Sequence, residues 1–234
     1  SFQFSDSQRP TLKDINFDVK PGEKVCIAGY NSSGKSTLIQ IVSGMLLDYE
    51  GSVSYNSAPM FNYDLKSLRR YIGDHGAQED IFQGTLWENI CLGHEEINMQ
   101  QIIWAVRQVG LEEFVQRLPK GYNTELVPSG RNLPQSVQTK ILLARSIVSQ
   151  PRLLALEEFL NKLQPNERER MCNMLTARSQ PWTLLAVSND PLLAARCERI
   201  ILMKDGEIVA EGDYSTLRGN PHFERIFQMN VPNG

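Results

Sequence analysis

The chain alternates between short apolar runs and segments in which apolar residues recur at helical spacing. Residues 25–28 are apolar, partly β-branched and preceded by the turn residues Pro21-Gly22, which predicts a buried strand. From residue 38 to 42 the apolar side chains follow the spacing of one helical face, and Gly44 ends this segment. The order strand, loop and helix is therefore predicted for this part of the chain.

The same kind of pattern predicts further strands later in the chain. Residues 152–156 and 183–187 have the pattern of buried strands next to helical segments. Asp205-Gly206 lies between alternating apolar residues, which indicates a hairpin. Residues 51–55 are predicted to form a short strand in a small antiparallel layer with the first residues of the chain. Strands that alternate with helices predict an α/β fold.

The middle of the chain is mainly helical in pattern. Between residues 85 and 150 the helical segments are separated by the stop signals Gly93, Gly110 and Ser129-Gly130. We expect a helical subdomain at about 86–150, inserted into the α/β core. No linker rich in Pro, Gly or Ser separates independent units, so residues 1–234 are expected to form one domain.

The composition excludes several other classes of protein. Hydrophobic residues make up 41% and charged residues 22% of the 234 residues, which excludes a disordered or collagen-like chain. The 24 Lys and Arg residues against 27 Asp and Glu residues give a net charge of −3, which offers no basic surface for nucleic acid. Apolar runs such as residues 182–187 are too short to span a bilayer, and no secretion signal begins the chain. The four cysteines lack metal-ligand spacing, so we expect a soluble cytoplasmic domain with reduced, mostly buried thiols rather than a disulfide.

The segment GYNSSGKS, Gly29 to Ser36, matches the pattern GxxxxGK[ST] between the predicted strand and helix. In such a loop the backbone N–H groups curve around a phosphate, the lysine bridges the β- and γ-phosphates, and the serine hydroxyl binds Mg²⁺. A chance match has a frequency on the order of 1%, and a Gly-rich turn without a ligand is the alternative. The segment predicts a site for ATP and Mg²⁺ formed by Gly29, Tyr30, Asn31, Ser32, Ser33, Gly34, Lys35, Ser36 and Thr37.

Two glutamates follow the predicted strand at 152–156. At the end of such a strand, P-loop proteins hold Mg²⁺ and activate water. Glu157 is therefore the expected metal ligand, and Glu158 is expected to act on the attacking water. The alternative is a pair of exposed glutamates at the start of a helix, where carboxylates are favourable.

These motifs resemble the ATP-binding domain of an ABC transporter over nearly the whole chain. The matching segments are, in order, TLKDINFDVKPGEKVCIAG, QEDIFQGTLWENI, ILLARSIVSQPRLLALEE and RIILMKDGEIVAEGDYSTL. The segment LPKGYNTELVPSG, residues 118–130, resembles the loop by which exporter-type members contact their membrane domains. The chain begins inside the first strand pattern. The resemblance therefore implies a domain of a longer polypeptide with transmembrane helices, at the cytoplasmic face of the cell membrane.

The resemblance also implies roles for three further residues. Phe4 falls where an aromatic ring stacks on adenine, with packing in the core as the alternative. Gln78 resembles the glutamine that binds Mg²⁺ and senses the membrane domain, although it lies one residue closer to Phe82 than usual and Ala77 takes the expected place. Asn189 stands where the family has a switch histidine. An asparagine there can hydrogen-bond the γ-phosphate, but unlike histidine it cannot take up or release a proton near neutral pH.

The chain departs from the family at positions that serve the dimer interface and the γ-phosphate. The signature LSGGQ is LPQSV at residues 133–137, which removes both glycines, although Pro134 suits the first turn of the helix expected there. The metal-position aspartate is Glu157, and the loop SALD is NKLQ at residues 161–164. The P-loop and both acidic positions, which bind one ATP on this chain, are kept. The resemblance is therefore to a degenerate ABC ATPase domain.

Three functions follow as hypotheses. The first is an ATP-hydrolysing domain of an ABC exporter that closes on a second nucleotide-binding domain, in a homodimer or heterodimer, and drives transport with slow turnover. Its catalytic residues would be Lys35, Gln78, Glu158 and Asn189. The second is a regulatory, essentially non-hydrolytic subunit that holds ATP while a partner hydrolyses it. The third, an unrelated P-loop kinase or soluble ATPase, is disfavoured by the order of the matching segments.

Overall fold

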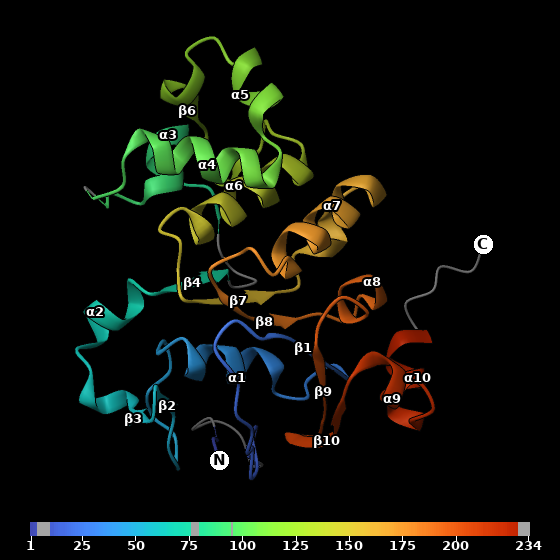
Figure 1. The fold of residues 1–234 in the computed structure, drawn as a ribbon. Coiled ribbons are helices and arrows are strands. Elements are labelled where there is room, and N and C mark those ends of the chain that lie inside the picture. The colour runs from blue at the N-terminus through green and yellow to red at the C-terminus, as the bar shows by residue number, and fades with distance from the viewer. Residues whose placement is uncertain (4–9, 76–79, 95, 229–234) are drawn as a thin grey trace.

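The computed structural model describes residues 1–3, 10–75, 80–94 and 96–228. Within these residues a six-stranded sheet in the order β10-β9-β1-β8-β7-β4 forms the centre, and it is parallel except for β10 (Figure 1). The strands are β1 (Lys24–Gly29), β4 (Ile72–His75), β7 (Leu153–Glu157), β8 (Thr183–Val187), β9 (Arg199–Lys204) and β10 (Glu207–Gly212). Because β1 lies between β8 and β9, the segment that follows it leaves from the middle of the sheet.

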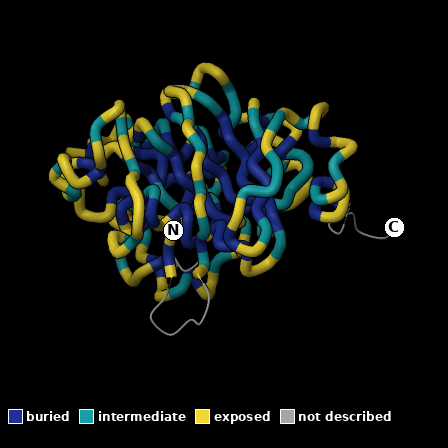
Figure 2. Tube along the Cα trace, turned by 90° about the horizontal axis from the view of Figure 1, so that it is seen from below, coloured by how far each residue is buried: buried dark blue, intermediate teal, exposed yellow. Residues whose placement is uncertain are grey.

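Alternating side chains along the strands place the two largest apolar clusters on opposite faces of the sheet, and a third, small cluster contains Met60, Leu68 and Ile72. Val25 and Ile27 of β1 pack in the cluster that includes helix α1 (Lys35–Val42), while Cys26 and Ala28 belong to the larger cluster with the other helices. In Figure 1, α1 lies on one side of the sheet and the helices α6 and α7 lie on the other. Figure 2 shows that buried residues fill the middle of the molecule. Cover on both faces explains why the central strands are apolar almost throughout.

A group of helices stands beyond the sheet, as the helical pattern between residues 85 and 150 predicts. It contains α3 (Leu86–Cys91), α4 (Met99–Val109), α5 (Glu112–Arg117) and α6 (Gln135–Ile147), with the short strands β5 (Gly84–Thr85) and β6 (Glu125–Leu126) (Figure 1). Capping boxes begin α3 at Thr85 and α4 at Asn98. The remaining helices are α2 (Leu65–Arg69), α7 (Pro165–Thr176), α8 (Pro191–Ala194), α9 (Tyr214–Leu217) and α10 (Pro221–Gln228), with 3₁₀ turns at Met60–Asn62, Gly121–Asn123, Pro128–Gly130 and Leu160–Lys162.

The strands predicted from apolar runs are confirmed. The run at 25–28 lies in β1, and the runs at 152–156 and 183–187 correspond to β7 and β8. The predicted hairpin is formed by β9 and β10, and it turns at Asp205-Gly206 with positive φ angles of 51° and 84°. These backbone angles are the reason that Asp-Gly is a strong hairpin signal.

The predicted pairing of residues 51–55 with the first residues is described only for residues 1–3, because residues 4–9 lie outside the described ranges. Within this stretch only Ser54–Tyr55 form a strand, β2, and it pairs with β3 (Ala58–Pro59). Asn56 and Ser57 between them both have positive φ, 48° and 66°, as a two-residue hairpin turn requires. Ser1 exchanges two backbone hydrogen bonds, at 2.8 and 3.0 Å, with Glu50, which directly precedes this stretch. Pairing of residues 51–55 with residues 4–9 stays a prediction.

All four cysteines are free and buried, as expected. Burial raises the pKa of the Cys172 thiol to about 12, so that thiol stays protonated near neutral pH and packs as a small apolar group. No helix in the described ranges is both long enough and apolar enough to cross a membrane.

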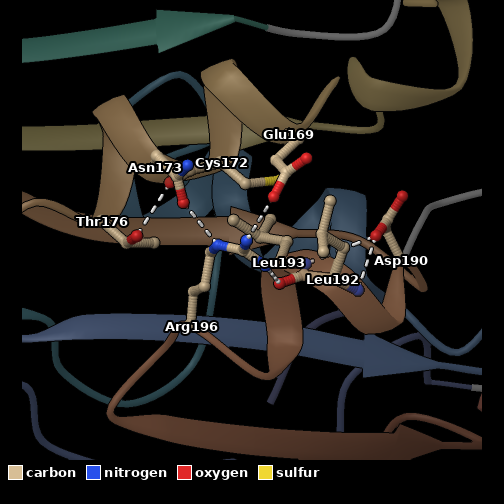
Figure 3. A network of polar contacts seen from close by, with 8 residues as sticks. All are labelled: Glu169, Cys172, Asn173, Thr176, Asp190, Leu192, Leu193 and Arg196. Atoms are coloured by element: carbon tan, nitrogen blue, oxygen red, sulfur yellow. Dashed lines mark hydrogen bonds and ion pairs between the residues drawn. The ribbon is translucent and has the colours of Figure 1, made fainter. Parts of the chain in front are cut away.

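Polar contacts fix α8 at its start and tie the chain after its end to α7 (Figure 3). The Asp190 carboxylate caps α8, because it accepts hydrogen bonds from the backbone N–H groups of Leu192 and Leu193 at 2.7 and 3.3 Å. Beyond α8, Arg196 donates from Nε to the Asn173 side chain of α7 at 2.6 Å. The start of α8 is therefore capped by Asp190, and Arg196 beyond its end is bonded to α7.

We predict that Asp190→Ala lowers the free energy of unfolding by about 1 kcal/mol, because it removes this helix cap. Urea denaturation followed by circular dichroism measures the change. Asp48→Ala is the matched control, since Asp48 is exposed and exposed substitutions of this kind usually change stability by less than about 0.5 kcal/mol. Equal destabilisation by the two substitutions would show that the cap contributes nothing.

Candidate functional site

A cleft of about 690 Å³ opens where β1 turns into α1. Its walls come from P-loop residues 31–37, from Glu157 and Glu158 after β7, and from the β9–β10 turn at Asp205-Gly206. The carboxyl ends of parallel strands are where open α/β sheets bind their ligands. The fold therefore brings the P-loop and both predicted acidic residues to one place.

Two glycines of the P-loop are required by close contacts. A Cβ at Gly29 would lie 2.2 Å from the Met203 carbonyl oxygen of β9. Gly34 has a φ of +88°, and a Cβ there would lie 2.6 Å from the Leu12 side chain. No other residue type fits at either position without moving the backbone. The spacing of the two glycines in the sequence motif thus has a direct steric cause.

Lys35 lies at the start of α1 with only 7% of its surface exposed. Its ammonium donates to the carbonyl oxygens of Gly29 at 3.1 Å and Tyr30 at 2.7 Å. Burial lowers the pKa of Lys35, and the carboxylates of Glu158 and Glu157 oppose that shift. The positive charge is thus held inside the loop, where a phosphate group can take over the contacts of the carbonyl oxygens.

Ser36 and Glu157 fit the role of Mg²⁺ ligands. The Ser36 hydroxyl donates to Glu157 Oε1, and Glu157 is 8% exposed at the end of β7. A hydroxyl and a carboxylate side by side form the kind of hard oxygen donor set that Mg²⁺ prefers, with nucleotide phosphates as further ligands. No cluster of three or more His, Cys, Asp or Glu side chains in the described part of the chain could hold a metal ion by itself. This donor set therefore suits an ion that arrives with a nucleotide.

Glu158 lies at the cleft wall next to this pair. Its side chain is exposed, and its backbone has a positive φ of 39°. The Glu158 N–H donates to the Val187 carbonyl oxygen at 3.0 Å, which ties this unusual backbone conformation to β8. Strained backbone at such a position is common in functional sites, so the geometry is compatible with the predicted role on water.

Asn189 follows β8, and its amide is bonded to the backbone of the P-loop. The Gly29 N–H donates to Asn189 Oδ1 at 2.9 Å, and Asn189 Nδ2 donates to the Gly29 carbonyl oxygen at 3.0 Å. The structure therefore brings Asn189 to the P-loop, as expected of the switch position. A contact with the γ-phosphate stays a prediction.

The changed signature at residues 133–137 begins α6, as the helix-compatible Pro134 predicts. Pro134 and Gln135 are exposed, while Leu133 and Val137 pack against the larger apolar cluster. None of these residues lines the cleft of this chain. The expected action of the signature on a nucleotide held by another domain stays a prediction.

Two predicted site residues, Phe4 and Gln78, lie outside the described residues, and so does Ala77. Their roles toward adenine and Mg²⁺ stay predictions. Residues 161–164 lead into α7, where the Gln164 side chain takes part in a capping box with Glu167. That segment thus keeps a structural role without the family's aspartate.

One contact of the P-loop has no signal in the sequence. The Tyr30 hydroxyl lies 3.2 Å from His222 Nδ1 on α10, and the two rings meet edge to face at 6.0 Å. His222 carries no motif that marks it, and it is 192 residues from Tyr30 in sequence. Lys13 also has no sequence signal, because only the fold brings it to the wall of the cleft.

Comparisons with known proteins agree with this geometry. The sequence profile of the ABC transporter family matches residues 12–161. YfiB of Bacillus subtilis, described as an uncharacterized ABC transporter ATP-binding protein, is 28% identical over 229 residues, which cover 97% of this chain and 40% of YfiB. The transport/processing ATP-binding protein ComA of Streptococcus pneumoniae is 32% identical over 210 residues, covering 89% of this chain and 29% of ComA.

The fold itself also has a close counterpart among solved structures. The structure of a bacterial Atm1-family ABC exporter with ATP bound aligns with this chain at a TM-score of 0.90 and 22% sequence identity. The alignment covers 100% of this chain and 41% of the exporter chain, which shows a shared fold. The chain spans 29% to 41% of the length of these three proteins.

We predict that Lys35→Ala lowers the affinity for Mg·ATP by about 10- to 100-fold, because a charged hydrogen bond to phosphate is lost. Isothermal titration calorimetry with Mg·ATP measures the change. Lys120→Ala, at an exposed position outside the cleft, is the control and should bind like the wild type. Unchanged affinity in Lys35→Ala would contradict the assignment of the nucleotide site.

Proposed function

This chain belongs to the ABC transporter family, and we propose that it is the ATP-binding and ATP-hydrolysing domain of an exporter-type member. The observation that carries the proposal is the arrangement at the carboxyl end of β1. A glycine-bounded loop, a buried lysine and the Ser36–Glu157 pair meet there in one cleft. These groups are suited to a triphosphate and its metal ion.

In the proposed complex the loop N–H groups and Lys35 bind the phosphates, while Ser36 and Glu157 hold Mg²⁺. The metal supplies charge neutralisation and orientation of the phosphate oxygens. Glu158, exposed at the cleft wall, accepts a proton from the attacking water. Gln78 is proposed as a further Mg²⁺ contact and Phe4 as the ring that stacks on adenine.

We further propose that hydrolysis is slow. In the family arrangement that the sequence resembles, each ATP lies between the P-loop of one domain and the signature of another. Pro134 and Gln135 replace signature residues at the exposed start of α6, and Asn189 replaces the switch histidine. The loss of a preorganised donor to developing charge lowers a rate by about 10²–10³-fold, so both composite sites of a dimer are affected.

The partners follow from the same family arrangement. A second nucleotide-binding domain, in a homodimer or a heterodimer, would complete the composite sites. Transmembrane domains, carried on the same polypeptide, would couple closure of the two domains to export at the cytoplasmic face of the membrane.

A regulatory, essentially non-hydrolytic subunit is the second candidate. The bonding of the Asn189 amide to the Gly29 backbone favours it, because the switch position is engaged within the chain itself. A steady-state ATPase measurement on the assembled transporter separates the two functions. Slow but measurable turnover that depends on this chain supports the first, and turnover confined to the partner supports the second.

We predict that Glu158→Gln abolishes the remaining hydrolysis by this chain while ATP affinity stays within about twofold, because the amide keeps the shape and cannot accept the proton. Phosphate release and calorimetric titration measure the two properties. Glu125→Gln is the matched control at an exposed position away from the cleft. Equal turnover in wild type and Glu158→Gln would remove Glu158 from the mechanism.

Restoring residues 134–137 to Ser-Gly-Gly-Gln is predicted to speed hydrolysis at the partner's P-loop by about 10²-fold or more, because close N–H donors return. The ATP affinity of this chain should not change, since residues 133–137 do not line its own cleft. Steady-state ATPase assays on a heterodimer whose partner keeps its switch histidine test this. A repaired assembly that turns over no faster would show that the signature is not the limiting defect.

A further inference from the structure

The parallel ladder between β1 and β8 ends just before the P-loop. Its last register pair is Ile27 with Val187, and the Ser188 N–H donates to the Ile27 carbonyl oxygen at 3.1 Å. Further along the same edge, Gly29 bonds to a side chain instead of a strand: its N–H donates to Asn189 Oδ1 at 2.9 Å and its carbonyl oxygen accepts from Asn189 Nδ2 at 3.0 Å. The side-chain amide of Asn189 thus makes the hydrogen bonds to Gly29 that backbone groups of β8 would make if the ladder continued.

The backbone on both sides of Asn189 is fixed by other contacts. Ser188 is buried, and its hydroxyl accepts the Asp190 N–H at 3.1 Å. Asp190 in turn caps α8 with its carboxylate (Figure 3). The amide of Asn189 is therefore presented to Gly29 from a rigid turn.

Gly29 is also where the P-loop and its lysine meet. On the opposite edge of β1 it is in register with Met203 of β9. Its carbonyl oxygen accepts a hydrogen bond from Lys35 Nζ at 3.1 Å as well as the one from Asn189. The position of this one residue thus determines where the loop begins and where the lysine ammonium lies.

We propose that Asn189 is a positioning residue of the P-loop. Its side-chain amide holds the backbone N–H and carbonyl groups of Gly29, and thereby the loop that receives the β-phosphate. This role rests on the proposed ATP site but differs from that of a γ-phosphate ligand. A γ-phosphate ligand supports ATP alone. A residue that positions the loop supports every nucleotide with a β-phosphate, so it supports ADP as much as ATP.

An amide suits this role better than the histidine of the family pattern. The amide carries an acceptor and a donor side by side, which match the N–H and carbonyl groups of one extended residue. A neutral imidazole also has one donor and one acceptor, but its two nitrogens point in diverging directions. Histidine at position 189 can therefore keep at most one of the two bonds to Gly29.

The test compares ATP and ADP affinity, in the presence of Mg²⁺, for wild type, Asn189→Ala, Asn189→His and Asn173→Ala. Asn173→Ala is the control, because it removes an asparagine that bonds to Arg196, away from the P-loop. Titration calorimetry well below the melting temperature measures each affinity per folded molecule. We expect Asn189→Ala to weaken ATP and ADP equally, by about threefold to tenfold, with the ATP-to-ADP ratio unchanged. Asn189→His should weaken both equally but less, and Asn173→Ala should weaken neither.

Two outcomes overturn the proposal. A loss confined to ATP in Asn189→Ala, or a gain confined to ATP in Asn189→His, would make position 189 a γ-phosphate contact. Unchanged affinity for both nucleotides, with a lower melting temperature alone, would make Asn189 a purely structural residue. If Asn189→Ala does not fold, the ATP-to-ADP affinity ratio of Asn189→His decides between a positioning role and a γ-phosphate contact. A wild-type protein that binds neither nucleotide would instead contradict the proposed function itself.

Discussion

The backbone of Gly29 is the point on which the site depends. Its N–H and carbonyl groups bond to the Asn189 amide, its carbonyl oxygen also accepts from Lys35, and its Cα lies so close to Met203 that a Cβ would sit 2.2 Å from the carbonyl oxygen. Contacts from β8, from α1 and from β9 thus converge on one residue without a side chain. A residue of any other type would push β1 and β9 apart, and the loop would begin elsewhere.

The rest of the sheet supports this arrangement. The alternation of apolar side chains sends Val25 and Ile27 toward α1 and Cys26 and Ala28 toward the opposite helices, so β1 is held on both faces as well as both edges. At the end of β7, two strands away, Glu157 meets the hydroxyl of Ser36. The parallel strands therefore end together, and their loops form one cleft. The proposed nucleotide site depends on these local contacts, whereas the changed signature lies on α6, outside the cleft. The proposed difference between binding and turnover rests on this separation.

The sequence predicts most of the central sheet because buried parallel strands are apolar runs with clear ends, and β7 and β8 illustrate this. It predicts the P-loop because the steric demands on Gly29 and Gly34 leave a fixed spacing. It misses features that are decided by residues of ordinary type, either through a local backbone angle or through a contact with a distant residue. The pairing of β2 is decided by positive φ angles at Asn56 and Ser57, which neither residue type requires. The bonds of Asn189 to Gly29, and of Tyr30 to His222, depend on strand order, which no local pattern contains.

The most direct test of the account is a single titration of the purified protein with radiolabelled Mg·ATP, followed by acid quenching and separation of ATP from ADP at saturation. The account predicts saturable binding of about one nucleotide per chain, with most of the bound label recovered as intact ATP. Absence of saturable binding would contradict the nucleotide site. Rapid conversion of the bound label to ADP would contradict the separation of binding from turnover.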